Sequence, residues 1–195
     1  MQRTLFHHSQ FPTVLAGLGA GVSPVTRFWL LAFTGSLAFA ASAQLVIPLF
    51  PVPVTAQTLV VMAFGLAVGW RLAGASVLLY LIEGLCGLPV FSKFGAGMGH
   101  LLGPTGGYLI GFVPAAVWCG WCAERGLDRK AMWLFVALLG AQLAVFVPGV
   151  LWLLVFVGDF TRAITAGLAP FILPELIKIA LLSAVFPLIW LRLSR

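Results

Sequence analysis

The stretch "IPLFPVPVT" (residues 47–55) divides the longest charge-free part of the chain in two. No Asp, Glu, Lys or Arg occurs from Phe28 to Trp70. A membrane-spanning helix needs about 20 mostly apolar residues, so this run has room for two. The three prolines of the stretch interrupt any helix, because proline has no backbone N–H and its ring clashes with the preceding turn. The sequence therefore predicts helices near 28–47 and 55–70, joined by a Pro-rich turn.

The composition of the whole chain extends this interpretation. Of its 195 residues, 62% are hydrophobic and only 8% are charged, whereas about a quarter of the residues of a soluble domain are charged. Charges and a Gly-rich segment separate further apolar runs near 72–88, 106–123, 131–157 and 170–191. We therefore expect an all-α integral membrane protein with six transmembrane helices. It forms a single transmembrane domain over 1–195, with 1–26 as an N-terminal cytoplasmic or interfacial segment.

The basic residues predict how the chain is oriented, because cytoplasmic loops carry an excess of Lys and Arg. With six spans and the N-terminus inside, two bases lie outside, Lys93 and Arg162, and Lys178 lies within a span. The other eight lie on the inner side: Arg3, Arg27, Arg71, Arg125, Arg129, Lys130, Arg192 and Arg195. We therefore expect a multi-pass membrane protein with both termini in the cytoplasm.

Several functional classes lack their signals. The bases are scattered and form no stripe for nucleic acid. The ATP-binding pattern G-x-x-x-x-G-K-[ST] does not occur, and no activated nucleophile or metal cluster suggests an enzyme or a cofactor. The C-x-x-C at Cys119 and Cys122 ends a predicted membrane helix, where packing is the expected role. The sequence therefore predicts a protein that is embedded in the lipid bilayer.

The stretch "PELIKI" (174–179) places an acid and a base in an apolar run. Ionisable side chains inside a membrane are costly and usually face a cavity or a partner. Glu175 and Lys178 are three residues apart and share a helix face. They can form a mutual ion pair, or Lys178 can meet the carboxylate of a ligand while Glu175 accepts a ligand N–H or orients the lysine. We predict that Lys178 meets the ligand carboxylate, because the pair lies one turn inside the outer surface, where a pocket is expected. The outer segments are the Pro-rich turn, the Gly-rich loop and the stretch before the sixth span, and all three are irregular, as non-helical backbone around an enclosed site would be.

Two other polar side chains in predicted spans are candidate ligand contacts. Glu83 lies in the third span, and either a ligand or an interhelical hydrogen bond explains it. Gln57 starts the second span, and its amide offers donors and an acceptor to a ligand or to another helix. For Gln44, near the end of the first span, we expect the interhelical role.

The stretch "GPTGGY" (103–108) begins the fourth predicted span. Its glycines allow a close approach of backbone to a ligand or to another helix, and N–H groups at a helix start can donate to a ligand oxygen. A tyrosine adds an apolar face with a polar tip. The candidate contacts are Thr105, Gly106, Gly107 and Tyr108.

Small residues recur every four positions in the first predicted span, at Ala32, Ser36 and Ala40. Such a ladder allows another helix to approach closely. It serves either internal packing or the interface with a partner subunit, and we predict the partner interface.

The stretches "PVPVTAQTLVVM", "GLPVF", "LLGPTGGYLIGF" and "PELIK", in this order and spacing, resemble the BioY family. These proteins are biotin-binding S components of energy-coupling-factor (ECF) transporters. The resemblance covers most of the chain and implies a six-helix protein of the bacterial inner membrane that captures biotin on its outer face. It also implies a transmembrane coupling protein and two ATPase subunits as partners.

The family's acid-x-x-lysine near the start of the sixth span matches Glu175 and Lys178. This chain has Pro174 and Glu175 where Gly and Asp are usual, and Ser92, Lys93 and Phe94 where small residues are usual; His100 is also unexpected. The expected function is high-affinity capture and transport of biotin. The alternative is a standalone channel or secondary transporter for a small vitamin-like anion.

Overall fold

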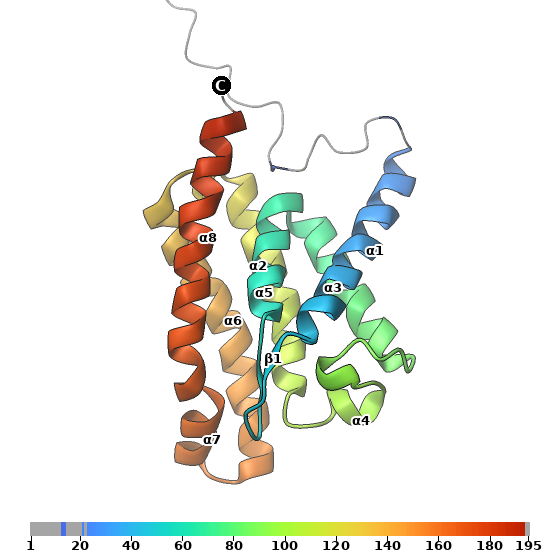
Figure 1. Cartoon of the computed structure of the whole chain (residues 1–195), viewed down its shortest axis with the longest axis vertical. Coiled ribbons are helices and arrows are strands. Elements are labelled where there is room, and N and C mark those ends of the chain that lie inside the picture. The colour runs from blue at the N-terminus through green and yellow to red at the C-terminus, as the bar shows by residue number, and fades with distance from the viewer. Residues whose placement is uncertain (1–12, 15–20, 22, 194–195) are drawn as a thin grey trace, which may run out of the picture.

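The computed structural model describes residues 13–14, 21 and 23–193 (Figure 1). Most of the predicted N-terminal segment, including Arg3, and also Arg195 lie outside the described residues. Six helices of 12 or more residues make up most of the described part: α1 (Pro24–Ala43), α2 (Gln57–Val68), α3 (Trp70–Leu85), α5 (Gly106–Glu124), α6 (Ala131–Val157) and α8 (Ile172–Leu193). The expected all-α membrane fold is confirmed.

Shorter elements connect these helices. They are β1 (Val46–Ile47), β2 (Val54–Thr55), α4 (Met98–Leu101), α7 (Phe160–Gly167) and the 3-10 turns η1 (Ser92–Phe94), η2 (Leu127–Arg129) and η3 (Ala169–Phe171). The Pro-rich turn is a β-hairpin in which β1 pairs antiparallel with β2. Because this hairpin uses residues predicted as helix, α1 ends at Ala43 and α2 begins only at Gln57.

Four segments are long and apolar enough to cross a membrane: Pro24–Ala43, Gly106–Glu124, Ala131–Val157 and Phe160–Arg192. Helices α2 and α3 are shorter, and Gly69 separates them at φ 87°. That left-handed conformation suits glycine, which has no Cβ to clash with the backbone. The tight turn between α2 and α3 therefore falls at Gly69.

Helix α5 lies at the centre of the bundle, where it packs against α2, α3 and α6. Small residues make this possible. At Gly111 an added Cβ would lie 2.8 Å from the Ala144 carbonyl oxygen of α6. That carbonyl lacks its usual helical donor because Pro148 has no N–H. The two helices therefore approach closely at a point where one of them has an interrupted hydrogen-bond ladder.

Helices α1 and α8 lie on opposite sides of the bundle (Figure 1). α1 contacts α3 and α2, whereas α8 contacts α6 and α2. Their outer faces expose large apolar side chains, as expected for a chain surrounded by lipid. On α1 these are Trp29, Leu30, Phe33 and Leu37; on α8 they are Leu173, Ile177, Leu181 and Leu188.

The two ends of the bundle differ. The cavity end contains the β-hairpin, α4 and α7 (Figure 1). The basic end contains the α5–α6 turn and the end of α8, with Arg125, Arg129, Lys130 and Arg192. There the Trp190 indole N–H donates to Asp128 Oδ2 at 2.6 Å, which fixes the end of α8 to the α5–α6 turn.

Candidate ligand-binding site

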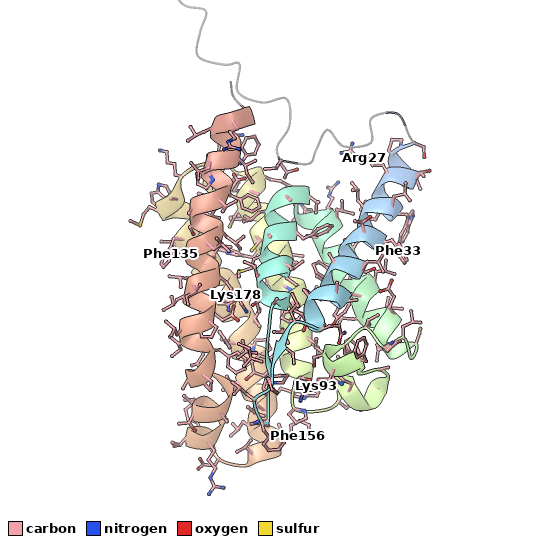
Figure 2. The ribbon with its side chains drawn as sticks, viewed as in Figure 1. Arg27, Phe33, Lys93, Phe135, Phe156 and Lys178 are labelled. Atoms are coloured by element: carbon pink, nitrogen blue, oxygen red, sulfur yellow. The ribbon has the colours of Figure 1, made fainter. Side chains whose placement is uncertain are left out.

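A network of four residues joins the start of α8 to the start of α2. Lys178 Nζ lies 2.6 Å from Glu175 Oε1, and Thr58 Oγ1 donates to Glu175 Oε2 at 2.7 Å. The lysine also donates to Thr58 Oγ1 at 2.8 Å and to the Thr55 carbonyl oxygen at 2.6 Å. Figure 2 shows Lys178 well inside the bundle, between α8 and α2. Both carboxylate oxygens of Glu175 therefore have a donor.

The lysine has no donor left over. An ammonium group carries three N–H bonds, and Thr55, Thr58 and Glu175 accept all three. Lys178 also does not line the adjoining cavity, whereas Glu175 and Thr58 do. A contact between Lys178 and a ligand carboxylate would require the lysine to exchange one of its partners. The arrangement is the mutual ion pair of Glu175 and Lys178, and the contact between Lys178 and a ligand carboxylate stays a prediction.

A second polar cluster lies next to this network. Gln57 Nε2 donates to the Tyr80 hydroxyl oxygen at 2.7 Å, and Thr55 Oγ1 donates to Gln57 Oε1 at 3.2 Å. The Tyr80 hydroxyl in turn donates to the Val90 carbonyl at 3.3 Å. The side chain of Gln57 is thus held on both sides while it lines the cavity.

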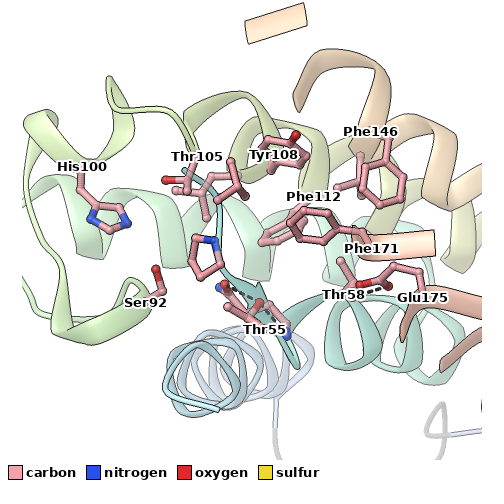
Figure 3. A pocket seen from close by; sticks show the side chains of 15 residues that line it. Thr55, Thr58, Ser92, His100, Thr105, Tyr108, Phe112, Phe146, Phe171 and Glu175 are labelled. Carbon is pink, nitrogen blue, oxygen red and sulfur yellow. Dashed lines mark hydrogen bonds between the residues drawn. The ribbon is translucent and has the colours of Figure 1, made fainter. Parts of the chain in front are cut away.

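An inner cavity of about 50 Å³ lies above these polar groups. Figure 3 shows Glu175 and Thr58 at one end of it and His100 and Ser92 at the other. Aromatic rings lie between the two ends. Tyr108 stacks on Phe171, with ring centroids 6.1 Å apart, and donates its hydroxyl to the Gly167 carbonyl at 2.8 Å. The cavity therefore has a polar floor and apolar, aromatic walls, which include Phe112 and Phe146.

An outer cavity of about 380 Å³ adjoins the inner one. Both are lined by Pro53, Ser92, His100 and Thr105, which form the boundary between them. The His100 ring stacks on Phe91 at 5.0 Å, and burial lowers the pKa of this histidine. At neutral pH the boundary therefore carries an uncharged imidazole. Lys93 lines the outer cavity.

The candidate ligand contacts of "GPTGGY" fall into two groups, one that lines the inner cavity and one that packs against neighbouring backbone. Thr105 and Tyr108 line the inner cavity. An added Cβ at Gly106 would collide with the Leu101 carbonyl, and one at Gly107 would collide with Trp152 and Pro148. These two glycines pack against neighbouring backbone, and neither lines the inner cavity. Their assignment as ligand contacts stays a prediction that this arrangement does not support.

Glu83 lies away from the cavity. Its Oε1 accepts a hydrogen bond from Ser36 Oγ at 3.0 Å, which joins α3 to α1. This is the interhelical role rather than the ligand role. The interhelical role expected for Gln44 stays a prediction, because its amide joins the end of α1 to the turn around η1: it donates to the Phe91 carbonyl at 3.0 Å and accepts from the Phe94 N–H at 3.0 Å.

The small-residue ladder of α1 faces the inside of the chain. Ala32 and Ser36 are fully buried, and Ala40 is partly buried and packs against the core. Gly35, next to Ser36, is so close to Phe64 and Ser76 that a Cβ would lie 2.9 Å from Ser76 Cβ. The internal alternative therefore accounts for Ala32 and Ser36, because a partner helix cannot reach side chains that this chain already covers.

The sequence interpretation missed several residues of the site. Thr58 had a usable signal, because "TAQT" (55–58) places two hydroxyls around Gln57 directly after the Pro-rich turn. Others are apolar or distant in sequence and had no such signal: Ser92, Phe112, Phe146 and Phe171. Aromatic residues are common throughout this chain, so nothing in the sequence distinguishes those that line a cavity.

This fold is that of a multi-pass membrane protein, with a cavity between helices over a floor of buried polar side chains. Such apolar cavities with a few convergent polar groups are typical of proteins that bind small molecules. The chain belongs to the BioY family, whose model matches residues 12–195.

Individual relatives agree with this membership. The chain is 41% identical to a probable biotin transporter BioY of Pyrococcus horikoshii over 71% of this chain and 80% of that protein. It is 36% identical to the biotin transporter BioY of Thermotoga maritima, over 76% and 85%. Among solved structures, the S-component for biotin from an ECF-type ABC transporter matches with a TM-score of 0.74 and 22% identity, covering 88% of this chain and 93% of that one. That similarity establishes the fold.

Proposed function

We propose that this chain captures biotin and serves in its transport across the membrane as the substrate-specific subunit of an ECF-type vitamin transporter. The names of its relatives support biotin as the ligand. The observation that carries the proposal is the network of Glu175, Lys178 and Thr58, which turns a held carboxylate towards a cavity with aromatic walls. The proposed activity is transport and not catalysis.

The chemistry of biotin matches the two ends of the site. Its ureido ring has two N–H donors and a carbonyl acceptor, its bicyclic body is apolar, and its side chain ends in a carboxylate. Glu175 is an acceptor that Lys178 and Thr58 hold in place, and it would accept a ureido N–H. The rings of Tyr108 and Phe171 would cover the apolar body. The carboxylate would then point to the outer cavity, which Lys93 lines.

The proposed orientation of the protein in the membrane rests on the distribution of its basic residues. With the excess of Lys and Arg in the cytoplasm, the basic end faces the cytoplasm and the cavity end faces outwards. Both termini are then cytoplasmic, and the cavity opens to the side from which a vitamin arrives. A cysteine placed at Lys93 should react with an impermeant reagent added outside, and one placed at Arg129 should not; the reverse pattern would contradict this orientation.

The partners we propose are a transmembrane coupling protein and two ATPase subunits, in keeping with the S-component fold. The apolar outer face of α1, with Trp29 and Phe33 exposed, offers a surface within the membrane for the coupling protein. Uptake into vesicles should require these partners together with ATP. Uptake by this chain alone, driven by a gradient, would favour a standalone transporter instead.

The decisive experiment is a titration of biotin into the purified chain. We expect saturable binding of one biotin per chain, and the absence of binding would contradict the proposal. The same titration with biotin amide, which lacks the charged carboxylate, tests the direction of the ligand. If Lys178 supports Glu175, Lys178→Ala should weaken the binding of acid and amide by the same factor, about 10- to 100-fold. A larger loss for the acid would show that Lys178 meets the carboxylate.

A further inference from the structure

Three buried polar side chains lie outside the candidate site and have incomplete hydrogen bonding. Among the residues that the structure describes, four buried side-chain atoms have no hydrogen-bond partner: Asp128 Oδ1, Gln142 Oε1 and Nε2, and Ser183 Oγ. Asp128 is fully buried, and Gln142 and Ser183 are 4% and 6% exposed. Buried polar groups are nearly always hydrogen-bonded, so these atoms point to a bound molecule.

All three residues belong to two neighbouring helices and the turn before one of them. Gln142 is on α6, Ser183 is on α8, and Asp128 is in the turn η2 that precedes α6. α6 and α8 pack against each other and run in opposite directions (Figure 1). We call Asp128, Gln142 and Ser183 the inner polar seam.

Two contacts at the ends of these helices indicate the approximate register of α6 on α8, with Asp128 in the turn η2 before α6 and Phe171 in the turn η3 before α8. Trp190 bonds Asp128 at the basic end, and the Phe146 and Phe171 rings meet at 5.8 Å near the cavity end. With a rise of about 1.5 Å per residue, both contacts place Ser183 about 10–12 Å nearer the basic end than Gln142.

The same register puts Gln142 at about the depth of Glu175, since each lies four residues from one member of the Phe146–Phe171 pair. Helical side chains lean towards the N-terminus of their own helix. Because the two helices are antiparallel, Gln142 leans towards the basic end and Ser183 leans towards the cavity end. Their polar ends therefore lie closer together along the bundle axis than their Cα atoms do.

We propose that the inner polar seam binds a file of ordered water molecules between α6 and α8. The file would extend from the depth of the cavity floor, at Gln142, past Ser183 to Asp128 at the basic end. Water fits these atoms because an amide, a hydroxyl and a carboxylate oxygen together need a molecule that both donates and accepts. A cation site would need more anionic oxygens than one carboxylate supplies.

The inner polar seam lies between the cavity floor and the basic end, outside the proposed binding site, and its water file does not depend on the ligand. It distinguishes the α6–α8 contact from the α5–α6 contact. The latter is close, with Gly107 and Gly111 against the backbone of α6. Water would therefore enter the bundle along α8 and not along α5.

The test is the reactivity of single cysteines in the full-length chain in lipid vesicles. Cys86, Cys119 and Cys122 are first replaced by alanine, and Ser183→Cys is then added. The probe is iodoacetamide, which reacts with the thiolate. A thiol in contact with water ionises more readily than one in apolar packing, so Ser183→Cys should react at least about tenfold faster than the controls.

Two controls match the helix and the burial. Leu181→Cys lies on α8 but faces outwards, since Leu181 is 50% exposed on the apolar surface. A variant that retains only the natural Cys119 has a thiol that is 1% exposed in α5. Equal rates for Ser183→Cys and these controls would overturn the proposal.

A second position keeps the proposal testable if Ser183→Cys does not fold. Gln142→Cys in the same background should also react faster than the controls. Adding Gln142→Leu to Ser183→Cys should slow the reaction, because it removes one polar contact of the file. An unchanged alkylation rate would show that Gln142 does not contact the water file. The proposal that the file reaches the depth of the cavity floor would then be wrong.

Discussion

Two buried carboxylates lie near opposite ends of α8. Glu175 belongs to the first turn of this helix, and Asp128 contacts its other end through Trp190. Glu175 is 3% exposed and Asp128 is fully buried. Both oxygens of Glu175 accept hydrogen bonds, and one of them contacts the ammonium of Lys178. Asp128 accepts the Trp190 indole N–H on one oxygen, and the other oxygen has no partner. Burial accordingly raises the pKa of Asp128.

The difference lies in what each carboxylate faces. Glu175 lines the inner cavity, so its complete network holds a negative charge where a ligand can reach it. Asp128 lines neither of the two cavities described above and attaches the end of α8 to the turn η2. On the proposed function Glu175 is a binding group, whereas Asp128 has a structural role, so mutations at the two ends should have separable effects on binding and on stability.

The largest expected effect is that of Lys178→Met. This change removes three donors and leaves Glu175 buried without its cation. Breaking a buried pair from one side destabilises a protein by roughly 3–5 kcal/mol, and biotin binding should weaken with it, as for Lys178→Ala. Lys130→Met, at an exposed base of the other end, should change stability by no more than about 0.5 kcal/mol. Denaturation in detergent measures both, and equal losses would refute the contrast.

Trp190→Phe should be next in size. It keeps an aromatic ring but removes the N–H that Asp128 accepts. A hydrogen bond to a charged group contributes about 1.5–3 kcal/mol, so the free energy of unfolding should fall by about this amount. Biotin affinity should stay the same, because Trp190 is at the basic end. A loss of affinity without a loss of stability would contradict the structural role of this end.

The same exchange of carboxylate for amide at both ends gives the sharpest comparison of binding. Glu175→Gln puts an amide where a charged acceptor faces the cavity and should weaken biotin binding by about 10- to 100-fold. Asp128→Asn should leave binding unchanged. Isothermal titration of biotin into the two variants measures this, and similar affinities would mean that Glu175 does not contact the ligand.

The smallest expected effect concerns pH at His100. Its pKa in the folded protein lies below the ordinary value of 6.5, so the unfolded chain binds the proton more readily. The neutral His100 ring therefore contributes fully to the free energy of unfolding above pH 6.5, and this contribution is lost as the pH falls below 6.5. Acidification below pH 6.5 should therefore destabilise the folded protein slightly, and biotin binding should weaken with it.

The control for this effect is His100→Phe, which preserves the stacking on Phe91 and has no titrating group. The variant should lose the part of the pH dependence that lies just below pH 6.5. Affinities measured from pH 7.5 to 5.5 provide the comparison. Identical pH profiles for the two proteins would show that another group is responsible.

The helices could be predicted from the sequence because lipid imposes a strong constraint on length and charge. The prolines of 47–55 and the charges between apolar runs located all six long helices. The hairpin was not foreseen, because β1 and β2 have only two residues each. The short helix α7 was also missed, since "GDFTRA" (158–163) has the polar composition of a loop although Asp159 caps a helix there.

The candidate site could be predicted where a charge stood out from apolar neighbours, as at Glu175 and Lys178. The same reasoning gave Glu83, yet that side chain bonds Ser36 on α1. A charge within a span indicates that a partner exists, but the sequence does not indicate whether the partner is a ligand or another helix. Asp128 gave no signal at all, because it lies in the most polar loop of the chain and its burial depends on the position of Trp190.

The small volume of the inner cavity has a consequence for the rates of binding. Pockets for drug-sized ligands occupy about 300–1,000 Å³, whereas the inner cavity measures about 50 Å³. A ligand the size of biotin is therefore larger than the inner cavity alone and crosses the boundary at Pro53, Ser92, His100 and Thr105, whose side chains have to move if it is to enter fully. Association that waits for such a motion is slower than diffusion allows. Once the boundary closes behind the ligand, escape waits for the same motion, so tight binding would come from a long residence time and not from fast capture.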